Sequence, residues 1–130
     1  MFLKKVLVVD DEPVFLEVLS TRLRAEGYRV ITASDGEAAL KKIRTEKPDA
    51  VLLDILMPKL DGLKTLRKIR QSRKRLPVYV LTAFSNEQRF GAAKKLGASG
   101  FIVKSDDLGR AIRNVTSSLS LASRYRPRSR

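Results

Sequence analysis

Polar side chains that could carry chemistry follow four apolar segments of this sequence. They are Asp10 and Asp11, Asp54, Thr82 and Lys104. Carboxylates brought together repel one another, and burying one without a partner is costly. A divalent cation offsets that repulsion, and Mg²⁺ takes one or two carboxylates together with waters and a phosphate. One carboxylate could then attack phosphorus to give an aspartyl phosphate, with Lys104 neutralising charge on the phosphoryl oxygens.

The elements that must position these residues alternate between strand and helix. Short β-branched and apolar runs predict five strands, over residues 6–9, 28–33, 50–55, 77–81 and 101–103. Strict alternation requires parallel strands with helices on both faces of the sheet. Because ligands bind at the carboxyl ends of such strands, we expect the three acids, the hydroxyl and the ammonium group to meet at one edge.

Local signals place a helix after each strand. Pro13 opens the first helix and Gly27 ends it, and Ser34 or Asp35 caps the second, which ends before a proline. Ser85, with Gln88 three positions later, resembles a capping box for the fourth helix. The third and fifth helices are indicated by apolar positions at helical spacing, Leu63, Leu66 and Ile69 in one and Leu108, Ala111, Ile112, Val115 and Leu119 in the other.

Length and composition limit the classes of function. The 130 residues allow one ordinary domain, predicted over residues 1–122, with a basic tail or the start of a linker at 123–130. The sequence has no cysteine and no histidine, which excludes disulfides, thiol nucleophiles and imidazole catalysis. No apolar run is long enough to span a membrane, so we expect a cytoplasmic protein.

Four segments and their spacing resemble the receiver domain of two-component response regulators, of the chemotaxis-regulator type. They are VLVVDDEP, VLLDILMPKLDG, VLTA and LGASGFIVK, and the resemblance covers about residues 3–120. It implies a doubly wound, flavodoxin-like α/β fold with a five-stranded parallel sheet in the order 2-1-3-4-5 and five helices. It also implies a signalling domain that takes a phosphoryl group from a histidine kinase or phosphotransfer protein, and that is not a metabolic enzyme.

The resemblance assigns a role to each residue of the site. Asp54 matches the phosphoacceptor, which would also contact Mg²⁺. Asp11 matches the direct metal ligand, Asp10 supports it through water, and Leu56 offers its backbone carbonyl. The Thr82 hydroxyl and the Lys104 ammonium group match the groups that bind the phosphoryl oxygens.

The resemblance also implies a switch. Phe101 occupies the switch-aromatic position and would fill the space that Thr82 vacates when it turns toward the phosphoryl group. The surface of helix 4, strand 5 and helix 5 would then control a downstream protein partner or effector domain, as a monomer or a phosphorylation-dependent dimer. Ser105 stands where the family has proline, which puts the loop before the fifth helix in doubt. Leu56 and Phe84 are bulky and apolar, which predicts a long-lived phosphoryl group.

The second unusual feature is a net charge of +13. No acid occurs between Asp61 and Glu87, and this stretch carries seven basic residues: Lys64, Arg67, Lys68, Arg70, Arg73, Lys74 and Arg75. A solvated helix usually mixes charges of both signs, so the run is a candidate face for an acidic protein, nucleic acid or an anionic membrane.

Two other functions compete with the receiver. An aspartyl-phosphate phosphatase of the haloacid-dehalogenase type would need a second aspartate two residues after Asp54, where Leu56 stands. A basic nucleic-acid-binding protein with a vestigial site would be expected to have lost part of the acid cluster, which is complete here. No helix-turn-helix or other motif that reads DNA sequence is visible.

Overall fold

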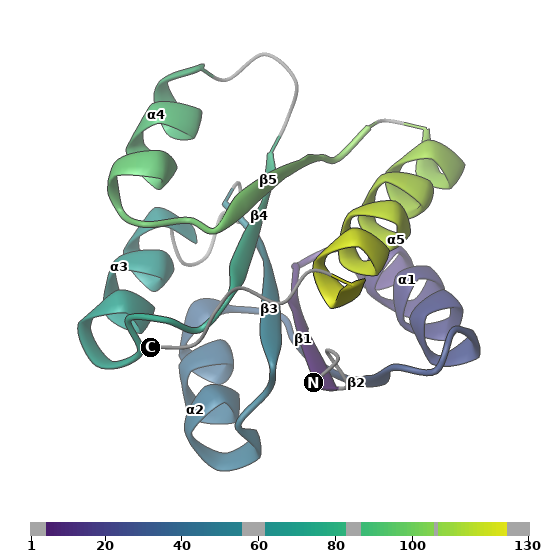
Figure 1. Ribbon diagram of the computed structural model, residues 1–130, viewed down its shortest axis with the longest axis horizontal. Coiled ribbons are helices and arrows are strands. Elements are labelled where there is room, and N and C mark those ends of the chain that lie inside the picture. Colours follow the sequence, from purple (N-terminus) through teal and green to yellow (C-terminus); the bar gives the residue numbers. More distant parts are fainter. Residues whose placement is uncertain (1–4, 56–61, 83–86, 106, 125–130) are drawn as a thin grey trace.

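The computed structural model describes residues 5–55, 62–82, 87–105 and 107–124. Its elements alternate strictly along the chain (Figure 1). They are β1 (Lys5–Val9), α1 (Pro13–Ala25), β2 (Arg29–Ala33), α2 (Gly36–Glu46), β3 (Ala50–Asp54), α3 (Gly62–Ser72), β4 (Val78–Thr82), α4 (Glu87–Lys95), β5 (Gly100–Val103) and α5 (Leu108–Arg124).

The strands form one parallel sheet in the order β2-β1-β3-β4-β5. The doubly wound α/β fold predicted from the sequence is therefore confirmed. Figure 1 shows α1 and α5 on one face of the sheet and α2, α3 and α4 on the other. The chain order reverses between β1 and β3, so the carboxyl ends of these two neighbouring strands mark the switch point where such folds bind ligands.

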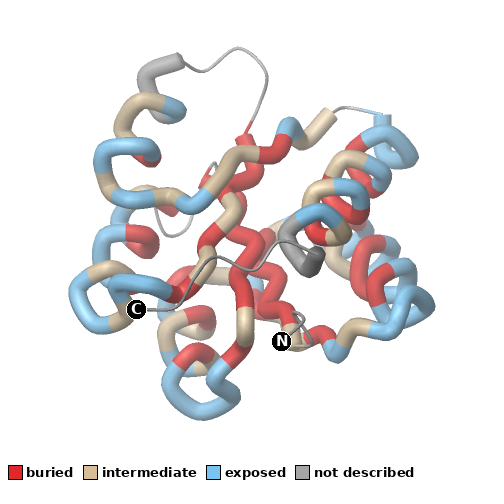
Figure 2. Tube along the Cα trace, viewed as in Figure 1, coloured by how far each residue is buried: buried red, intermediate tan, exposed pale blue. Residues whose placement is uncertain are grey.

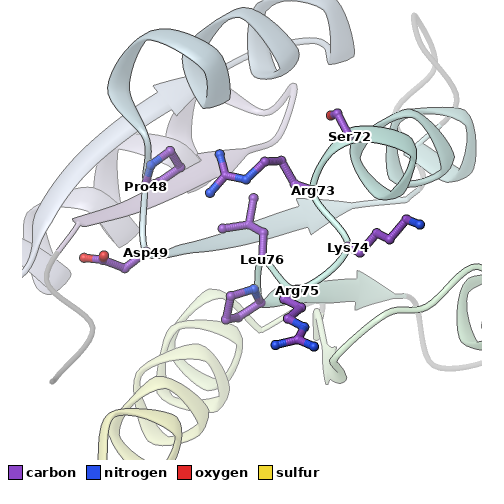
Figure 3. Close-up of a pocket in the computed structure, with 8 residues that line it drawn as sticks. Pro48, Asp49, Ser72, Arg73, Lys74, Arg75 and Leu76 are labelled. Atoms are coloured by element: carbon purple, nitrogen blue, oxygen red, sulfur yellow. The ribbon is translucent and has the colours of Figure 1, made fainter. Parts of the chain in front are cut away.

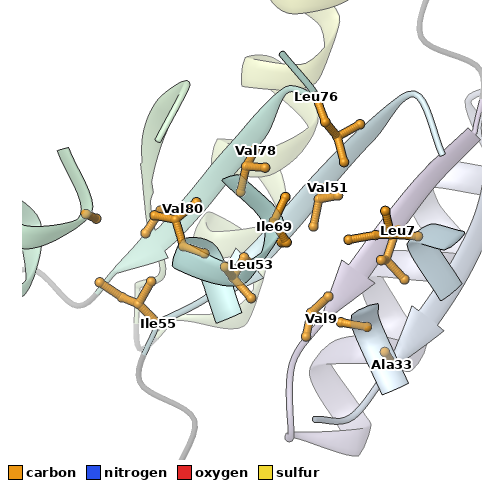
Figure 4. Packing of buried hydrophobic residues seen from close by; sticks show 14 residues of the cluster. Leu7, Val9, Ala33, Val51, Leu53, Ile55, Ile69, Leu76, Val78 and Val80 are labelled. Atoms are coloured by element: carbon orange, nitrogen blue, oxygen red, sulfur yellow. The ribbon is translucent and has the colours of Figure 1, made fainter. Parts of the chain in front are cut away.

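The core is divided by the sheet into two layers, because successive strand residues point to opposite faces. Leu7, Val51 and Val80 contribute to the layer beneath α2, α3 and α4 (Figure 4). Val8 and Leu52, the next residues along β1 and β3, contribute to the layer beneath α1 and α5. Both layers bury these side chains completely, which explains the nearly continuous apolar strands of the sequence (Figure 2).

Most of the predicted helix signals lie where expected. Pro13 is the first residue of α1, and the Asp35 side chain caps α2 by accepting a hydrogen bond from the Ala38 amide at 2.8 Å. Gly27 follows α1 with a φ of +100°, in the left-handed region that glycine adopts at little cost. The Ser85 capping box lies outside the described residues. The fifth helix extends to Arg124, two residues into the segment predicted as a tail.

The start of α3 lies directly against the end of β3. A Cβ added at Gly62 would lie 2.3 Å from the Ile55 Cα and 2.6 Å from the Asp54 carbonyl oxygen. Only a residue without a side chain permits this approach. Gly62 therefore sets how closely the third helix sits behind the end of the strand that carries Asp54.

Candidate functional site

Three carboxylates meet at the carboxyl ends of β1 and β3. Asp10 and Asp11 follow β1, and Asp54 is the last residue of β3. One carboxylate oxygen from each lies within 4.8 Å of the others. Asp10 and Asp54 are buried, with exposed fractions of 0 % and 4 %, while Asp11 is half-buried. The expectation that parallel strands would bring these acids together therefore holds in the structure.

The ammonium group of Lys104 bridges the buried acids. Its Nζ donates to Asp10 Oδ2 at 2.7 Å and to Asp54 Oδ2 at 3.2 Å. The Lys104 amide donates to the Thr82 carbonyl at 3.0 Å, which fixes the residue after β5 against the end of β4. Lys104 follows β5, which lies on the opposite side of the central strand β3 from β1. Its positive charge offsets part of the repulsion between the carboxylates.

Two further residues hold Lys104, and sequence reasoning assigned neither of them to the site. Glu12 accepts a hydrogen bond from its ammonium group, and the Phe15 ring centroid lies 4.6 Å from Nζ. Glu12 is the N-cap residue of α1, yet its side chain caps no amide, since its carboxylate is turned to Lys104. The Glu12 amide donates to Asp10 Oδ1 at 3.0 Å. The only feature of the sequence that could have indicated a role for Glu12 is its place in the acidic run after β1.

The electrostatics of the cluster follow from burial. Burial raises the pKa of Asp10 from 3.8 to about 6, and the charge of Asp54 acts in the same direction, while hydrogen bonds from Lys104 and the Glu12 amide oppose the rise. Burial lowers the pKa of Lys104, but its hydrogen bonds to Asp10 and Glu12 and the charge of Asp54 outweigh this and raise it. Lys104 is therefore a cation throughout the neutral range.

The donor set fits a hard divalent cation. Mg²⁺ prefers oxygen ligands and is held by few carboxylates at once, and the three convergent carboxylates offer such oxygens. Asp11 is the most exposed of the three, which suits a direct ligand at the mouth of the site. The predicted fourth ligand, the Leu56 carbonyl, lies outside the described residues.

Thr82 and Phe101 lie on neighbouring strands and on the face of the sheet that α4 covers. Val80 pairs with Phe101 in the register of β4 and β5, and both pack in the core layer beneath α2, α3 and α4. Thr82, two residues after Val80, shares that face and is buried. The Phe101 ring contacts Phe90 of α4, with 4.2 Å between the ring centroids. Sequence reasoning did not identify Phe90.

Ser105, at the position where the family has proline, takes part in the hydrogen bonds before α5. The Ser105 hydroxyl accepts a hydrogen bond from the Asp107 amide at 3.1 Å, and Asp107 Oδ1 accepts one from the Arg110 amide at 3.0 Å. The hydrogen bond from Arg110 lowers the pKa of Asp107. Ser105 is thus linked by a hydrogen bond to Asp107, whose side chain caps the start of α5. Phe84, predicted to flank the phosphoryl group, lies outside the described residues.

The predicted basic face divides into two kinds of residue. Lys64, Arg67, Lys68, Lys74 and Arg75 are exposed, and Arg73 is half-buried beside them. Arg70 is half-buried, and its guanidinium donates to the carbonyls of Gly97 and Arg73, each at 2.9 Å, and to Ser99 Oγ at 3.3 Å. Burial lowers its pKa. Arg70 therefore ties the end of α3 to the turn after α4 and belongs to the fold.

The family model of the response regulator receiver domain matches residues 6–116, which include the acid cluster and Lys104. The chain belongs to the response regulator receiver family. It is 46 % identical over 101 residues to the alkaline phosphatase synthesis transcriptional regulatory protein PhoP of Bacillus subtilis. That alignment covers 78 % of this chain and 42 % of the relative, so this receiver spans about two fifths of the length of the curated relatives it matches.

Solved structures of response regulators share the fold over almost the whole receiver. The phosphorylated cyanobacterial phytochrome response regulator RcpA superposes with a TM-score of 0.86 at 28 % identity, covering 96 % of this chain and 99 % of that one. The Mn²⁺-bound form of response regulator Rcp1 superposes with a TM-score of 0.84 at 28 % identity, covering 98 % and 99 %. Within the described residues, no helix is both long and apolar enough to cross a membrane.

Proposed function

We propose that this receiver accepts a phosphoryl group on Asp54 from a phosphohistidine donor, in a reaction that depends on Mg²⁺. The observation that carries the proposal is the convergence of Asp10, Asp11 and Asp54 at one sheet edge, with Lys104 bonded to two of them. The names of two similar structures, one phosphorylated and one bound to Mn²⁺, support the same chemistry.

The chain's own residues divide the work of the transfer. A carboxylate oxygen of Asp54 attacks the phosphorus while the bond between phosphorus and the donor's imidazole nitrogen breaks, and that nitrogen keeps the electron pair. Lys104 Nζ lies 3.2 Å from Asp54 Oδ2 and would neutralise charge on the transferred phosphoryl oxygens. Asp10 and Asp11 would hold Mg²⁺, which supplies further positive charge to those oxygens when bound.

We infer that the phosphoryl group is read through Thr82, Phe101 and α4. A hydrogen bond from the Thr82 hydroxyl to the phosphoryl group would draw Thr82 toward the site and open space on the sheet face that it shares with Phe101. Phe101 would then leave its ring contact with Phe90, which is 42 % exposed. The surface formed by α4, β5 and α5 would then change shape, and a downstream protein or effector domain would respond to that change.

The proposal also covers the bounds of the domain, its location and its partners. The receiver, expected over residues 1–122, extends to the end of α5 at Arg124, and the basic segment after it is a tail or linker. The domain belongs to a cytoplasmic protein that exchanges phosphoryl groups with a histidine kinase or phosphotransfer protein. The longer curated relatives are named as transcriptional regulators, which favours a regulatory output.

Intact-mass spectrometry after incubation with acetyl phosphate tests the proposal. We expect one phosphoryl adduct that requires Mg²⁺ and is lost in Asp54→Asn. Asp49→Asn is the matched control, because Asp49 precedes the same strand at its opposite end and accepts a hydrogen bond from the Lys5 amide at 2.9 Å. An adduct that persists in Asp54→Asn, or that forms equally with a chelator present, would contradict the assignment.

A further inference from the structure

A second charged region lies away from the phosphoacceptor edge. It consists of Arg44 of α2, Lys68 of α3, and Arg73, Lys74 and Arg75 of the loop between α3 and β4, and we call it the basic band. Two grooves connect its members. One, of about 410 Å³ between α2 and α3, is lined by Arg44, Lys68 and Arg73. The other, of about 580 Å³, is lined by the three loop cations together with Pro48 and Asp49.

The side chains of the band spread over a broad surface. Figure 3 shows Arg73 extending toward Pro48, while Lys74 points away from it and Arg75 leaves the loop in a third direction. Arg73 lines both grooves and so joins them. The second groove lies before β3 and β4, at the amino ends of the strands, whereas Asp54 lies at the carboxyl end. A ligand on the band would therefore leave Asp54 accessible.

Three of the five cations of the band have no acidic partner among the described residues. Arg44, Lys68 and Lys74 form no ion pair with any residue in the described ranges. Among the described residues, Asp49 is the one acid that lines either groove, and its Oδ2 accepts a hydrogen bond from the Lys5 amide. Lys64 and Lys68 stand four residues apart on α3, a spacing at which like charges destabilise a helix. An anionic ligand would relieve this repulsion.

The lining residues favour one class of polyanion. No aromatic side chain from the described part of the chain lines either groove, so these residues offer no platform for stacking of single-stranded bases. The apolar lining residues of both grooves are buried, apart from Leu40 and Pro77, which are half-buried. Neither groove therefore exposes a large apolar side chain that could anchor a protein partner or a membrane. Lysine and arginine side chains spread over such a surface suit regularly spaced phosphates. We propose that the basic band binds the phosphate backbone of duplex DNA without reading its sequence.

The test compares two double variants of the full chain that change the same charge on opposite faces of the sheet. Lys68→Glu with Lys74→Glu alters the band, and Arg110→Glu with Arg113→Glu alters α5. Each pair replaces two exposed cations and lowers the formal net charge of +13 by four. The basic tail is the same in both variants, so any contribution from residues 125–130 cancels.

Fluorescence anisotropy with a labelled random-sequence duplex, measured over a range of salt concentrations, gives the readout. We expect the band pair to weaken binding by about tenfold or more and to reduce the slope of log affinity against log salt by roughly 2, because two phosphate contacts are lost. The α5 pair should weaken binding by less than about threefold, through the general field alone.

Several results would overturn the proposal. Equal weakening by both pairs, no weakening by the band pair, or tighter binding of single strands or polyglutamate than of the duplex would each do so. Circular dichroism melting checks that both pairs fold. The neutral pair Lys68→Gln with Lys74→Gln keeps the test decisive if the charge reversal unfolds the chain, since it should still weaken duplex binding more than Arg110→Gln with Arg113→Gln.

Discussion

The carboxyl edge of the sheet and the basic band hold like charges in opposite physical settings. At the edge, Asp10 and Asp54 are buried and share one cation, Lys104. In the band, Lys68 and Lys74 are exposed and form no ion pair with the described residues. Charges interact strongly where water is excluded and weakly where it screens them. Repulsion at the edge is therefore relieved fully only when a divalent cation binds, while the band attracts anionic ligands at little cost to the fold.

The largest effect is expected at Gly62, where the helix that carries part of the band meets the carboxyl edge. Gly62→Ala would place a Cβ within 2.6 Å of both the Ile55 Cα and the Asp54 carbonyl, and it should destabilise the protein by about 3 kcal/mol. Urea unfolding measures the loss. Gly91→Ala is the matched control, because its Cβ meets nothing within 4 Å, and it should stabilise α4 by up to about 1 kcal/mol. Equal effects of the two variants would contradict the close approach.

Lys104→Met tests whether the edge needs its cation. The pKa of Lys104 is raised on folding, so its stabilising contribution is fully present at neutral pH and is lost only as pH rises through that raised value. We expect a loss of about 2 kcal/mol at neutral pH, from unpaired buried acids. The loss should shrink as pH falls, because Asp10, whose pKa burial raises and which no longer has the opposing hydrogen bond from Lys104, takes up a proton. Lys41→Met, at an exposed position of α2, should change unfolding free energy by less than about 0.5 kcal/mol.

Asp10→Asn should stabilise the fold while weakening the predicted metal site. The pKa of Asp10 rises from 3.8 to about 6 on folding, so its ionised form costs stability above that range and the cost disappears below pH 3.8. We expect a gain of about 1 to 2 kcal/mol at neutral pH. Urea unfolding at several pH values would show the gain vanish in acid. A variant equally stabilised at acidic and neutral pH would not fit this explanation.

Arg70→Ala tests the same contrast within the basic stretch of the sequence, because Arg70 belongs to that stretch but forms hydrogen bonds that stabilise the fold. Removing its hydrogen bonds to the Gly97 carbonyl and Ser99 Oγ should cost about 1 kcal/mol of unfolding free energy. Arg67→Ala, on the exposed side of α3, should change it by less than about 0.5 kcal/mol. If both variants lose the same stability, Arg70 is part of the surface and not of the fold.

The fold could be predicted because the apolar runs, the helix-end residues and the order of the elements all indicate the same structure. The runs around Val8 and Leu52 are apolar enough to require burial on both faces, and Pro13, Gly27 and Asp35 mark helix ends at the observed places. Parallel strands alone then bring Asp10, Asp54 and Lys104 to one edge. Consistency of this kind across levels is what makes a fold readable from one chain.

Contacts made by long side chains across the fold were less predictable. Glu12 lies at a helix start, where capping is the ordinary expectation, and only the position of Lys104, 92 residues later, explains its direction. Phe90 in a polar helix gave no sign that it would contact the Phe101 ring. The sequence does not distinguish Arg70 from its basic neighbours, because its hydrogen bond to the Gly97 carbonyl depends on how α3 and the turn after α4 pack together. Tertiary packing decides these contacts, and no local pattern carries them.

Amide chemical shifts measured by nuclear magnetic resonance, on adding Mg²⁺ and then beryllofluoride as a phosphoryl mimic, test the central claim most directly. We predict that Mg²⁺ shifts the amides of Asp10, Asp11 and Ile55, and that beryllofluoride extends the shifts to Phe101 and α4. The amides of residues 73–75 in the basic band should stay unchanged. Shifts confined to that loop, or none around Asp54, would contradict the assignment of the carboxyl edge as the phosphoacceptor and metal site.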